Sequence, residues 1–330
     1  MGYCPDFLSM IMSRIFPLWV LLLTACTGQP VAIAPDVVHA RAHNGGSIVE
    51  FSQDGELLAS GGWEGRVFIW RLPGGEPVYR WQAHQDSVNG VVFTDNNTHV
   101  VTAGYDGLLA EWTPGGAALR RVMTPAPITC MAASNRDDRL ITGHHDGSVR
   151  IWRLHDLSLL EERKLHRGKV RAVALETSGG RYASSGADGD VYVWTDDTEA
   201  ASLERPPTDA WSLAFSPDGR WLYGGGWFRL FRWNLGDGAF VSLPTEHHGI
   251  IKSIQFTADG GELATISRQT DSAVLFLDPV TGAVTRRFQQ HELCGASIAV
   301  SPRGRYLATT SDDASVRIWV LNRKGETDAH

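Results

Sequence analysis

A histidine, a hydroxyl side chain and an aspartate recur together in this sequence, and such a trio could carry out nucleophilic hydrolysis. In a serine hydrolase the histidine takes the proton of the attacking hydroxyl, and the aspartate orients the histidine. Here the hydroxyl residue lies four positions before the aspartate, and a tryptophan lies six positions after it. Complete sets occur three times: His84, Thr102, Asp106 and Trp112; His166, Ser184, Asp188 and Trp194; and His291, Thr309, Asp313 and Trp319. Repetition suits a structural role rather than a single active site, so we predict that the chain is not an enzyme.

The segments that must position these residues also repeat along the chain. In Gly143–Trp152, Asp146-Gly147 is a tight-turn pair, and the residues after it alternate between polar and apolar as a strand does. Residues that close the same pattern recur at intervals of 39 to 44 positions: Trp70, Trp112, Trp152, Trp194, Trp233, Leu277 and Trp319. A period near forty with a tryptophan closing one strand is typical of a four-stranded propeller blade. Seven such marks predict seven blades.

On these repeats the sequence resembles the WD40 repeat family, from about residue 36 to the end of the chain. The resemblance implies an all-β fold, a seven-bladed WD40-type β-propeller closed by an N-terminal strand, in one domain of residues 37–330. The last repeat stops soon after Trp319 and lacks an outer strand, which in this family the N-terminal residues supply. We expect the segment around Val37–Arg41 to complete the last blade, because closure of the ring removes exposed strand edges.

The resemblance also implies that the histidine, the hydroxyl residue, the aspartate and the tryptophan form a buried hydrogen-bonded network in each blade. Four repeats depart from the full set. Repeat one has Glu64 in place of the aspartate, and repeat three has Thr124-Pro125 where the histidine would fall. Repeat six has Leu277 in place of the tryptophan, and repeat five, with Gly224-Gly225-Gly226-Trp227, has lost the aspartate.

Composition and motifs argue against several classes of function. The 330 residues include 30 Lys and Arg against 37 Asp and Glu, a net charge of −7, with no clustered basic patch of the kind that binds nucleic acid. No phosphate-binding loop is present, and we expect no cofactor. His144-His145 and His247-His248 fall in distant repeats without cysteine or carboxylate at a zinc-like spacing, so we expect no metal site. Cys130 and Cys294 belong to well-separated blades, and we expect them not to form a disulfide.

The first residues predict export and lipid attachment. Arg14 precedes an uncharged apolar run, Ile15–Leu23, which is too short to span a bilayer but is typical of a secretory signal. Leu23-Thr24-Ala25-Cys26 resembles the bacterial lipobox, so we expect a signal peptide in residues 1–25, a lipid on Cys26, and a membrane tether in residues 26–36. Thr27 stands where an aspartate would retain a lipoprotein in the inner membrane, which favours the outer membrane facing the periplasm. An ordinary cleaved signal with a chance cysteine is the alternative.

Partner binding in WD40 propellers recurs at two sets of positions on the top face. The first set follows the first apolar residue of each inner strand: Ser47, Asn89, Thr129, Arg171, Trp211, Lys252 and Ala296. The second set immediately precedes the turn aspartate: Trp63, Tyr105, His145, Ala187 and Asp312. Trp227 lies nearby in the irregular repeat five. Trp, Tyr and Arg are enriched at interface hot spots. We therefore predict these partner-binding residues: Trp63, Asn89, Tyr105, His145, Arg171, Trp211, Trp227 and Lys252.

Together these features predict a membrane-tethered, non-enzymatic and monomeric scaffold that binds a protein or peptide in the bacterial periplasm. The alternative is a propeller that binds a small molecule or a glycan in its central channel. A peptide platform would lose its partner on Trp211→Ala, whereas a small-molecule binder would show a thermal shift with a metabolite or a sugar fragment.

Overall fold

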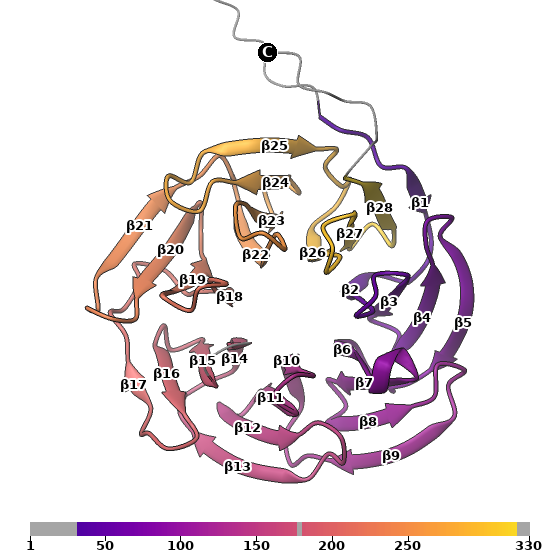
Figure 1. Cartoon of the computed structure of the whole chain (residues 1–330), viewed down its shortest axis with the longest axis horizontal. Coiled ribbons are helices and arrows are strands. Elements are labelled where there is room, and N and C mark those ends of the chain that lie inside the picture. Colours follow the sequence, from indigo (N-terminus) through magenta and orange to yellow (C-terminus); the bar gives the residue numbers. More distant parts are fainter. Residues whose placement is uncertain (1–31, 177–179, 322–330) are drawn as a thin grey trace, which may run out of the picture. The chain divides into compact units, whose positions relative to one another are not determined.

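The computed structural model describes residues 32–176 and 180–321, and in these ranges the chain forms seven four-stranded antiparallel sheets arranged as a ring (Figure 1). Each sheet is a blade, and its strands follow one another outward from a central channel. The predicted all-β, seven-bladed propeller is confirmed. Within the described ranges no helix has the length and apolar character needed to cross a membrane. Cys26 and the signal peptide expected in residues 1–25 lie outside the described residues.

Each blade begins with a strand at the channel, followed by a second strand that pairs with it. The innermost strands are β2 (Gly46–Phe51), β6 (Val88–Thr94), β10 (Ile128–Ser134), β14 (Val170–Leu175), β18 (Ser212–Phe215), β22 (Ile250–Phe256) and β26 (Gly295–Val300). The second strands are β3 (Leu57–Gly62), β7 (His99–Gly104), β11 (Arg139–His144), β15 (Arg181–Gly186), β19 (Trp221–Gly225), β23 (Leu263–Arg268) and β27 (Tyr306–Ser311). A short 3-10 helix, η1 (Asp95–Asn97), joins β6 to β7.

The third strands end near the repeating tryptophan, and the outermost strands cover them. The third strands are β4 (Arg66–Arg71), β8 (Leu108–Trp112), β12 (Ser148–Arg153), β16 (Val191–Thr195), β20 (Arg229–Asn234), β24 (Val274–Leu277) and β28 (Val316–Val320). The outermost strands are β5 (Glu76–Gln82), β9 (Ala118–Met123), β13 (Leu159–Lys164), β17 (Ala201–Ser202), β21 (Phe240–Pro244), β25 (Val284–Phe288) and β1 (Val37–His39).

An N-terminal segment closes the ring, as predicted. β1 pairs antiparallel with β28 and completes blade seven. The residues before β1 reach blade six, where the carbonyl of Ile33 accepts a hydrogen bond from the N–H of Gln289 (2.8 Å). The residue at the end of β1, His39, stacks on Trp70 of blade one with ring centroids 4.3 Å apart. One short segment therefore joins three blades, and its contacts begin within residues 32–36, the described part of the expected tether.

The hydrophobic core lies between neighbouring blades. Between blades one and two, for example, Val67 and Ile69 of β4 belong to the same buried cluster as Val91 and Phe93 of β6. These residues alternate along their strands with residues that face the opposite side of the sheet, which is the period-two pattern expected of strands. Because each blade packs against two neighbours, both of its faces carry apolar side chains. This packing holds the inner strands and the loops between them in fixed positions around the channel.

The Asp-Gly turn that the sequence predicted is present between β11 and β12. Gly147 has a φ of 86°, a conformation that glycine adopts without strain. A Cβ atom added there would overlap the carbonyl oxygen of His166 in the next blade. Asp146 Oδ1 accepts hydrogen bonds from the N–H and the hydroxyl of Ser148 (3.0 and 2.6 Å). Glycine at this turn therefore permits close packing between blades as well as the tight reversal of the chain.

Candidate functional site

The repeated trio forms the expected buried network in blade two. Trp112 Nε1–H donates a hydrogen bond to Thr102 Oγ1 (2.8 Å), which in turn lies 2.7 Å from His84 Nε2. His84 Nδ1 lies 3.0 Å from Asp106 Oδ1. Although burial opposes ionisation of Asp106, hydrogen bonds from His84 and two backbone N–H groups hold the pKa of its carboxyl below the usual range. Thr102 is fully buried, so its hydroxyl cannot attack a substrate, and the network is structural.

Blade four forms the same histidine bonds but differs at the tryptophan. His166 lies 2.8 Å from Ser184 Oγ and 3.1 Å from Asp188 Oδ1. Trp194 Nε1, however, has no hydrogen-bond partner among the described residues. The Trp194 ring lies beside Arg163 instead, whose guanidinium carbon is 5.7 Å from the ring centroid. The expectation that all four side chains would be hydrogen-bonded together is therefore wrong for Trp194.

Blade seven also departs from the expected pattern at its tryptophan. His291 lies 2.6 Å from Thr309 Oγ1 and 2.9 Å from Asp313 Oδ2, as expected. Trp319 Nε1–H, however, donates to the carbonyl of Ile33 (3.0 Å) and not to Thr309. The reason is ring closure, because the N-terminal segment brings this carbonyl to the indole.

Two repeats that depart from the full set also form the network, blade one through the expected Glu64 and blade three through a histidine that the sequence pattern did not indicate. In blade one, Glu64 takes the place of the aspartate, and its carboxylate lies 3.0 Å from His43 Nδ1. In blade three, His144 from β11 supplies the missing imidazole, and its Nε2 lies 2.9 Å from Thr142 Oγ1. Burial lowers the pKa of His144 to about 4, so its ring is neutral at physiological pH. His144 is thus a member of the blade network, and no cluster of three metal-ligating side chains occurs in the described ranges.

A cavity of about 660 Å³ opens at the end of the channel where the inner strands begin. All seven positions of the first predicted set line it: Ser47, Asn89, Thr129, Arg171, Trp211, Lys252 and Ala296. From the second set, Trp63 and Tyr105 also line it. The structure therefore brings six of the eight predicted partner-binding residues to one cavity.

His145 and Trp227, the other two predicted partner-binding residues, do not line this cavity. The imidazole of His145 lies edge-on to Tyr105, with ring centroids 5.9 Å apart. Trp227 pairs with Ile250 through an isolated β-bridge and packs against the ring of Phe228, 5.4 Å away. His145 therefore lies beside a cavity-lining residue, whereas Ile250 and Phe228, which Trp227 contacts, do not line the cavity.

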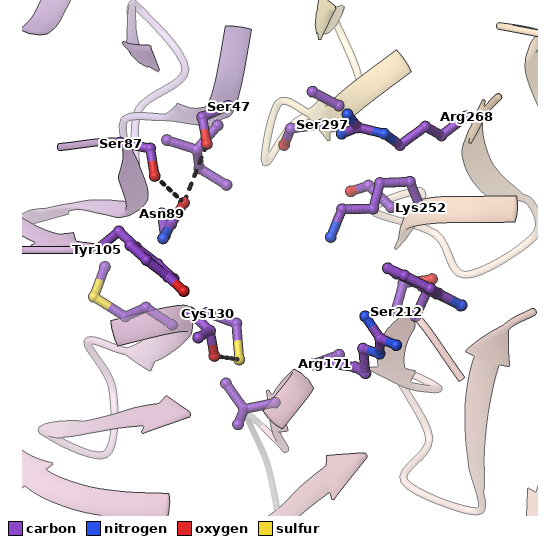
Figure 2. Close-up of a pocket in the computed structure, with 18 of the residues that line it drawn as sticks. Ser47, Ser87, Asn89, Tyr105, Cys130, Arg171, Ser212, Lys252, Arg268 and Ser297 are labelled. Carbon is purple, nitrogen blue, oxygen red and sulfur yellow. Dashed lines mark hydrogen bonds between the residues drawn. The ribbon is translucent and has the colours of Figure 1, made fainter. Parts of the chain in front are cut away.

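The cavity has a cationic side, and the opposite side is lined mainly by uncharged polar groups (Figure 2). Trp211 of blade five lies on the cationic side. Blades four and six, on either side of blade five, contribute the cations: Lys169, Arg171, Lys252 and Arg268. Across the cavity, blades one to three contribute mainly hydroxyl and amide groups, together with Tyr105: Ser47, Ser87, Asn89 and Thr129. In Figure 2 the Lys252 side chain extends into the space that separates the two sides. The only carboxylate among the lining residues is Asp86 of blade two.

The cations of this cavity are unequally neutralised. Arg171 lies 3.2 Å from the carboxylate of Asp209, and Arg268 lies 2.9 Å from that of Asp312. Among the described residues, neither a carboxylate nor a hydrogen-bond partner acts on the ammonium groups of Lys169 and Lys252. Burial, together with repulsion from the neighbouring cations, lowers the pKa of Lys252 to about 8. Burial also lowers the pKa of Lys169.

Trp211 is held against the cationic side. The guanidinium carbon of Arg171 lies 3.8 Å from the centroid of its ring, and Lys252 Nζ lies 5.9 Å from the same ring. Contacts of this kind between cations and aromatic faces are attractive. They fix the orientation of both the indole and the guanidinium at the channel mouth.

Reasoning from the sequence missed several lining residues, including Lys169, Arg268 and Cys130. Lys169 directly precedes the inner strand of blade four, two positions before Arg171. Arg268 lies three residues after Thr265, the same offset that separates Tyr105 from Thr102. Cys130 also lines the cavity, and burial raises the pKa of its thiol. It is not bonded to Cys294, as predicted.

The sequence profile described as "WD domain, G-beta repeat" matches six segments of the chain. These are residues 37–71, 75–113, 119–153, 158–195, 200–234 and 282–320. Each match begins with the outer strand of one blade and ends with the third strand of the next. The matches pass over residues 235–281, where the third strand of blade six ends in Leu277 instead of tryptophan.

Curated proteins with similar repeats come from several eukaryotes. Striatin-4 of Homo sapiens is 23% identical over 285 residues, which cover 75% of this chain and 38% of striatin-4. WD repeat-containing protein SL1-17 of Schistosoma mansoni is 28% identical over 207 residues, covering 58% and 65% of the two chains. Autophagy-related protein 16 of Arabidopsis thaliana is 26% identical over 211 residues, covering 61% and 42%. This chain spans less than two thirds of the length of each of these relatives. Since the profile matches cover more than half of the chain and follow the blades of a seven-bladed propeller, the chain belongs to the WD40 repeat family.

Proposed function

We propose that this chain is a non-catalytic platform that binds a protein or peptide partner at the mouth of its channel. The observation that carries this proposal is the convergence of aromatic and cationic side chains on one cavity of about 660 Å³, including Trp63, Tyr105, Arg171 and Trp211. Tryptophan, tyrosine and arginine contribute large shares of binding energy in protein interfaces, because they bury much area and keep a polar group. The hydroxyls of the repeated trio are buried and do not offer an alternative catalytic centre.

A small molecule or glycan in the channel is the second candidate function. It is favoured by the volume of the cavity, which falls within the range of small-molecule sites, roughly 300–1,000 Å³. Such a ligand would raise the melting temperature of the purified protein, and the rise would grow with the logarithm of ligand concentration above the Kd. It would give no cross-link to another protein from the cavity wall.

Site-specific photo-crosslinking in cells distinguishes these functions. We expect a benzophenone amino acid at position 211 to capture one discrete protein, which mass spectrometry identifies. The matched control places the same amino acid at Arg220, which lies after the hairpin turn at the far end of the same inner strand and has a side chain that is 80% exposed. The platform requires capture from position 211 and not from position 220. Equal capture from both positions, or none from 211, would contradict it.

We further propose that the platform is lipid-anchored through Cys26 in a bacterial envelope, at the outer membrane facing the periplasm. The support is the sequence Leu23-Thr24-Ala25-Cys26 after an apolar run, with Thr27 following the cysteine. Cys26→Ala should abolish incorporation of labelled palmitate and move the protein from the detergent phase to the aqueous phase. Cys130→Ala, which removes a cysteine of the propeller, should change neither. Palmitate labelling that persists in the Cys26→Ala variant would disprove the anchor, and density fractionation of membranes tests the outer-membrane location.

A further inference from the structure

We infer that the channel mouth recognises an acidic segment of the partner, whose carboxylates bind between Lys169 and Lys252 on the cationic side of the cavity. This inference rests on the proposed platform function and names the chemistry of the partner. Its starting point is the charge balance of one cavity, which has four cationic side chains and a single carboxylate, that of Asp86, among its lining residues. The whole chain carries a net charge of −7, so the cationic side is a local exception to the charge of the molecule.

The two lysines are the groups that need an anion. Two carboxylates outside the lining already pair with the arginines, Asp209 with Arg171 and Asp312 with Arg268. Lys169 and Lys252 have no such pairing within the described part of the chain, although both belong to the cavity wall. A charged group that is partly removed from water loses hydration energy, and an opposite charge nearby restores it. A ligand carboxylate between them would supply that charge.

Further donors on the same side lack acceptors. The Nε atom of Arg171 and the Nε1 atom of Trp211 are both buried without a hydrogen-bond partner among the described residues. Because Arg171 is stacked on Trp211 and paired with Asp209, its position is fixed before any ligand binds. An anion that approaches this side therefore meets charges that are already ordered, which lowers the entropic cost of binding.

The opposite side suits the backbone of a peptide. The hydroxyls of Ser47 and Ser87 line it and donate to Asn89 Oδ1 (3.3 and 3.2 Å), which leaves their own oxygens able to accept hydrogen bonds from peptide N–H groups. The tyrosine on this side, Tyr105, adds an aromatic surface, and Lys169 Nζ lies 5.5 Å from its ring centroid. Acidic side chains directed to blades four and six, with the backbone against blades one to three, would satisfy both sides. A nucleic acid is disfavoured, because the net negative charge of the molecule repels an extended polyanion beyond this cavity.

The test uses a fluorescein-labelled hexaglutamate peptide amide and measures its anisotropy with the purified protein. We expect hexaglutamate to bind, hexaglutamine of the same length not to bind, and the affinity to fall as salt rises. Replacement of both lysines, Lys169→Met with Lys252→Met, should weaken binding by roughly tenfold or more, because two partly buried opposite charges are lost. Lys252→Arg should retain binding, and each variant should melt within a few degrees of the unchanged protein.

The matched control is Lys164→Met, which removes the same charge from the exposed outer strand β13, where Lys164 pairs with Asp146 (3.3 Å). It should leave the affinity nearly unchanged. Equal binding of hexaglutamate and hexaglutamine, or equal loss with Lys164→Met, would overturn the inference. If inorganic phosphate displaces labelled hexaglutamate as effectively as unlabelled peptide does, the inference is also overturned and the cavity is assigned to a small anion. A protein cross-linked from position 211 without any binding of hexaglutamate would refute the acidic segment and leave the platform standing.

Chemical labelling gives an independent readout of the same cavity. The amine of Lys252 should become reactive to limiting acetic anhydride near pH 8, whereas exposed lysines react at higher pH, because only the deprotonated amine is a nucleophile. Hexaglutamate should slow the acetylation of Lys169 and Lys252, since a bound carboxylate favours the protonated amine, and it should leave Lys164 unchanged. Peptide mass spectrometry measures all three. Equal slowing at Lys164 would show that the peptide binds the surface without regard to the cavity.

Discussion

A chain that begins at Arg41 is expected to melt about 10 °C or more below a chain that begins at Ala32. Residues 32–40 supply the fourth strand of blade seven and the carbonyl that accepts the hydrogen bond of the Trp319 indole. They also supply His39, which stacks on Trp70, and Asp36, whose carboxylate accepts a hydrogen bond from the N–H of Val320 (2.8 Å). Their removal loses contacts to three blades at once and leaves the edge of β28 unpaired.

Circular dichroism melts of the two chains, with gel filtration of each, measure this effect. An unpaired strand edge promotes association, so the shorter chain should also elute as oligomers. Addition of a synthetic peptide of residues 32–41 should raise the melting temperature of the shorter chain, because the missing strand can bind in trans. If both chains melt alike and elute as monomers, β1 does not hold the ring closed, and another contact between blades six, seven and one must do so.

The number of blades could be predicted from the sequence because a blade is a packing unit with a fixed length of chain. Leu277 shows that the fixed length of a blade holds even where the closing tryptophan is replaced. It replaces the tryptophan of blade six, yet it lies at the end of β24, fully buried, and the sheet forms around it. The spacing of closing residues therefore located a blade that the family profile passes over. Closure by β1 followed from the same count, because the last repeat was one strand short.

The hydrogen bonds within the blades were less predictable, because different side chains and backbone groups can present the same acceptor or donor. Glu64 replaces an aspartate, and His144 of β11 replaces a histidine that other blades supply from the segment before the inner strand. A backbone carbonyl, that of Ile33, replaces a threonine hydroxyl for Trp319. A pattern of residue types identifies only one of the possible hydrogen-bond partners for each side chain. The carbonyl of Ile33 comes from a segment distant in sequence, and only the folded ring brings it to Trp319.

The candidate site, too, was predicted from the sequence only in part. Its seven inner-strand positions were predicted, because the register of each inner strand repeats around the channel. Arg268 was missed because the second set of partner-binding positions was defined as the residues directly before the turn aspartate. In blade six that aspartate, Asp271, lies six residues after Thr265 instead of four. Because the turn in blade six is longer, this definition did not reach Arg268, which occupies the place that Trp63 and Tyr105 occupy in their blades. The charge balance of the cavity became visible only when Arg268 and Lys169 were added.

Asp313→Ala is expected to lower the free energy of unfolding by about 3–5 kcal/mol, because it leaves a buried charge without its partner. Asp313 lies 2.9 Å from His291 and 3.3 Å from Arg317, and the arginine side chain is only 8% exposed. Asp106→Ala should cost less, about 1–3 kcal/mol, because the groups that it leaves unpaired, His84 and two backbone N–H groups, do not include a buried arginine. Asp197→Ala, at an exposed position, is the control for loss of one negative charge. Urea melts at neutral pH measure all three.

The pH dependence separates lost hydrogen bonds from a general packing defect. Burial opposes ionisation of Asp313, but hydrogen bonds from His291 and Ser315 hold the pKa of its carboxyl well below 3.8 in the folded state. A group whose pKa is lowered on folding stabilises the protein above its unfolded pKa, and that contribution is lost as the pH falls through the folded pKa. The difference between Asp313→Ala and the unchanged protein should therefore be full at pH 7 and shrink below about pH 4. Neither aspartate lines the cavity, so both variants should bind hexaglutamate with unchanged affinity at temperatures where they are folded. A stability difference that stays constant down to the lowest pH would assign the loss to packing, and a loss of peptide binding would show that the blade network shapes the site itself.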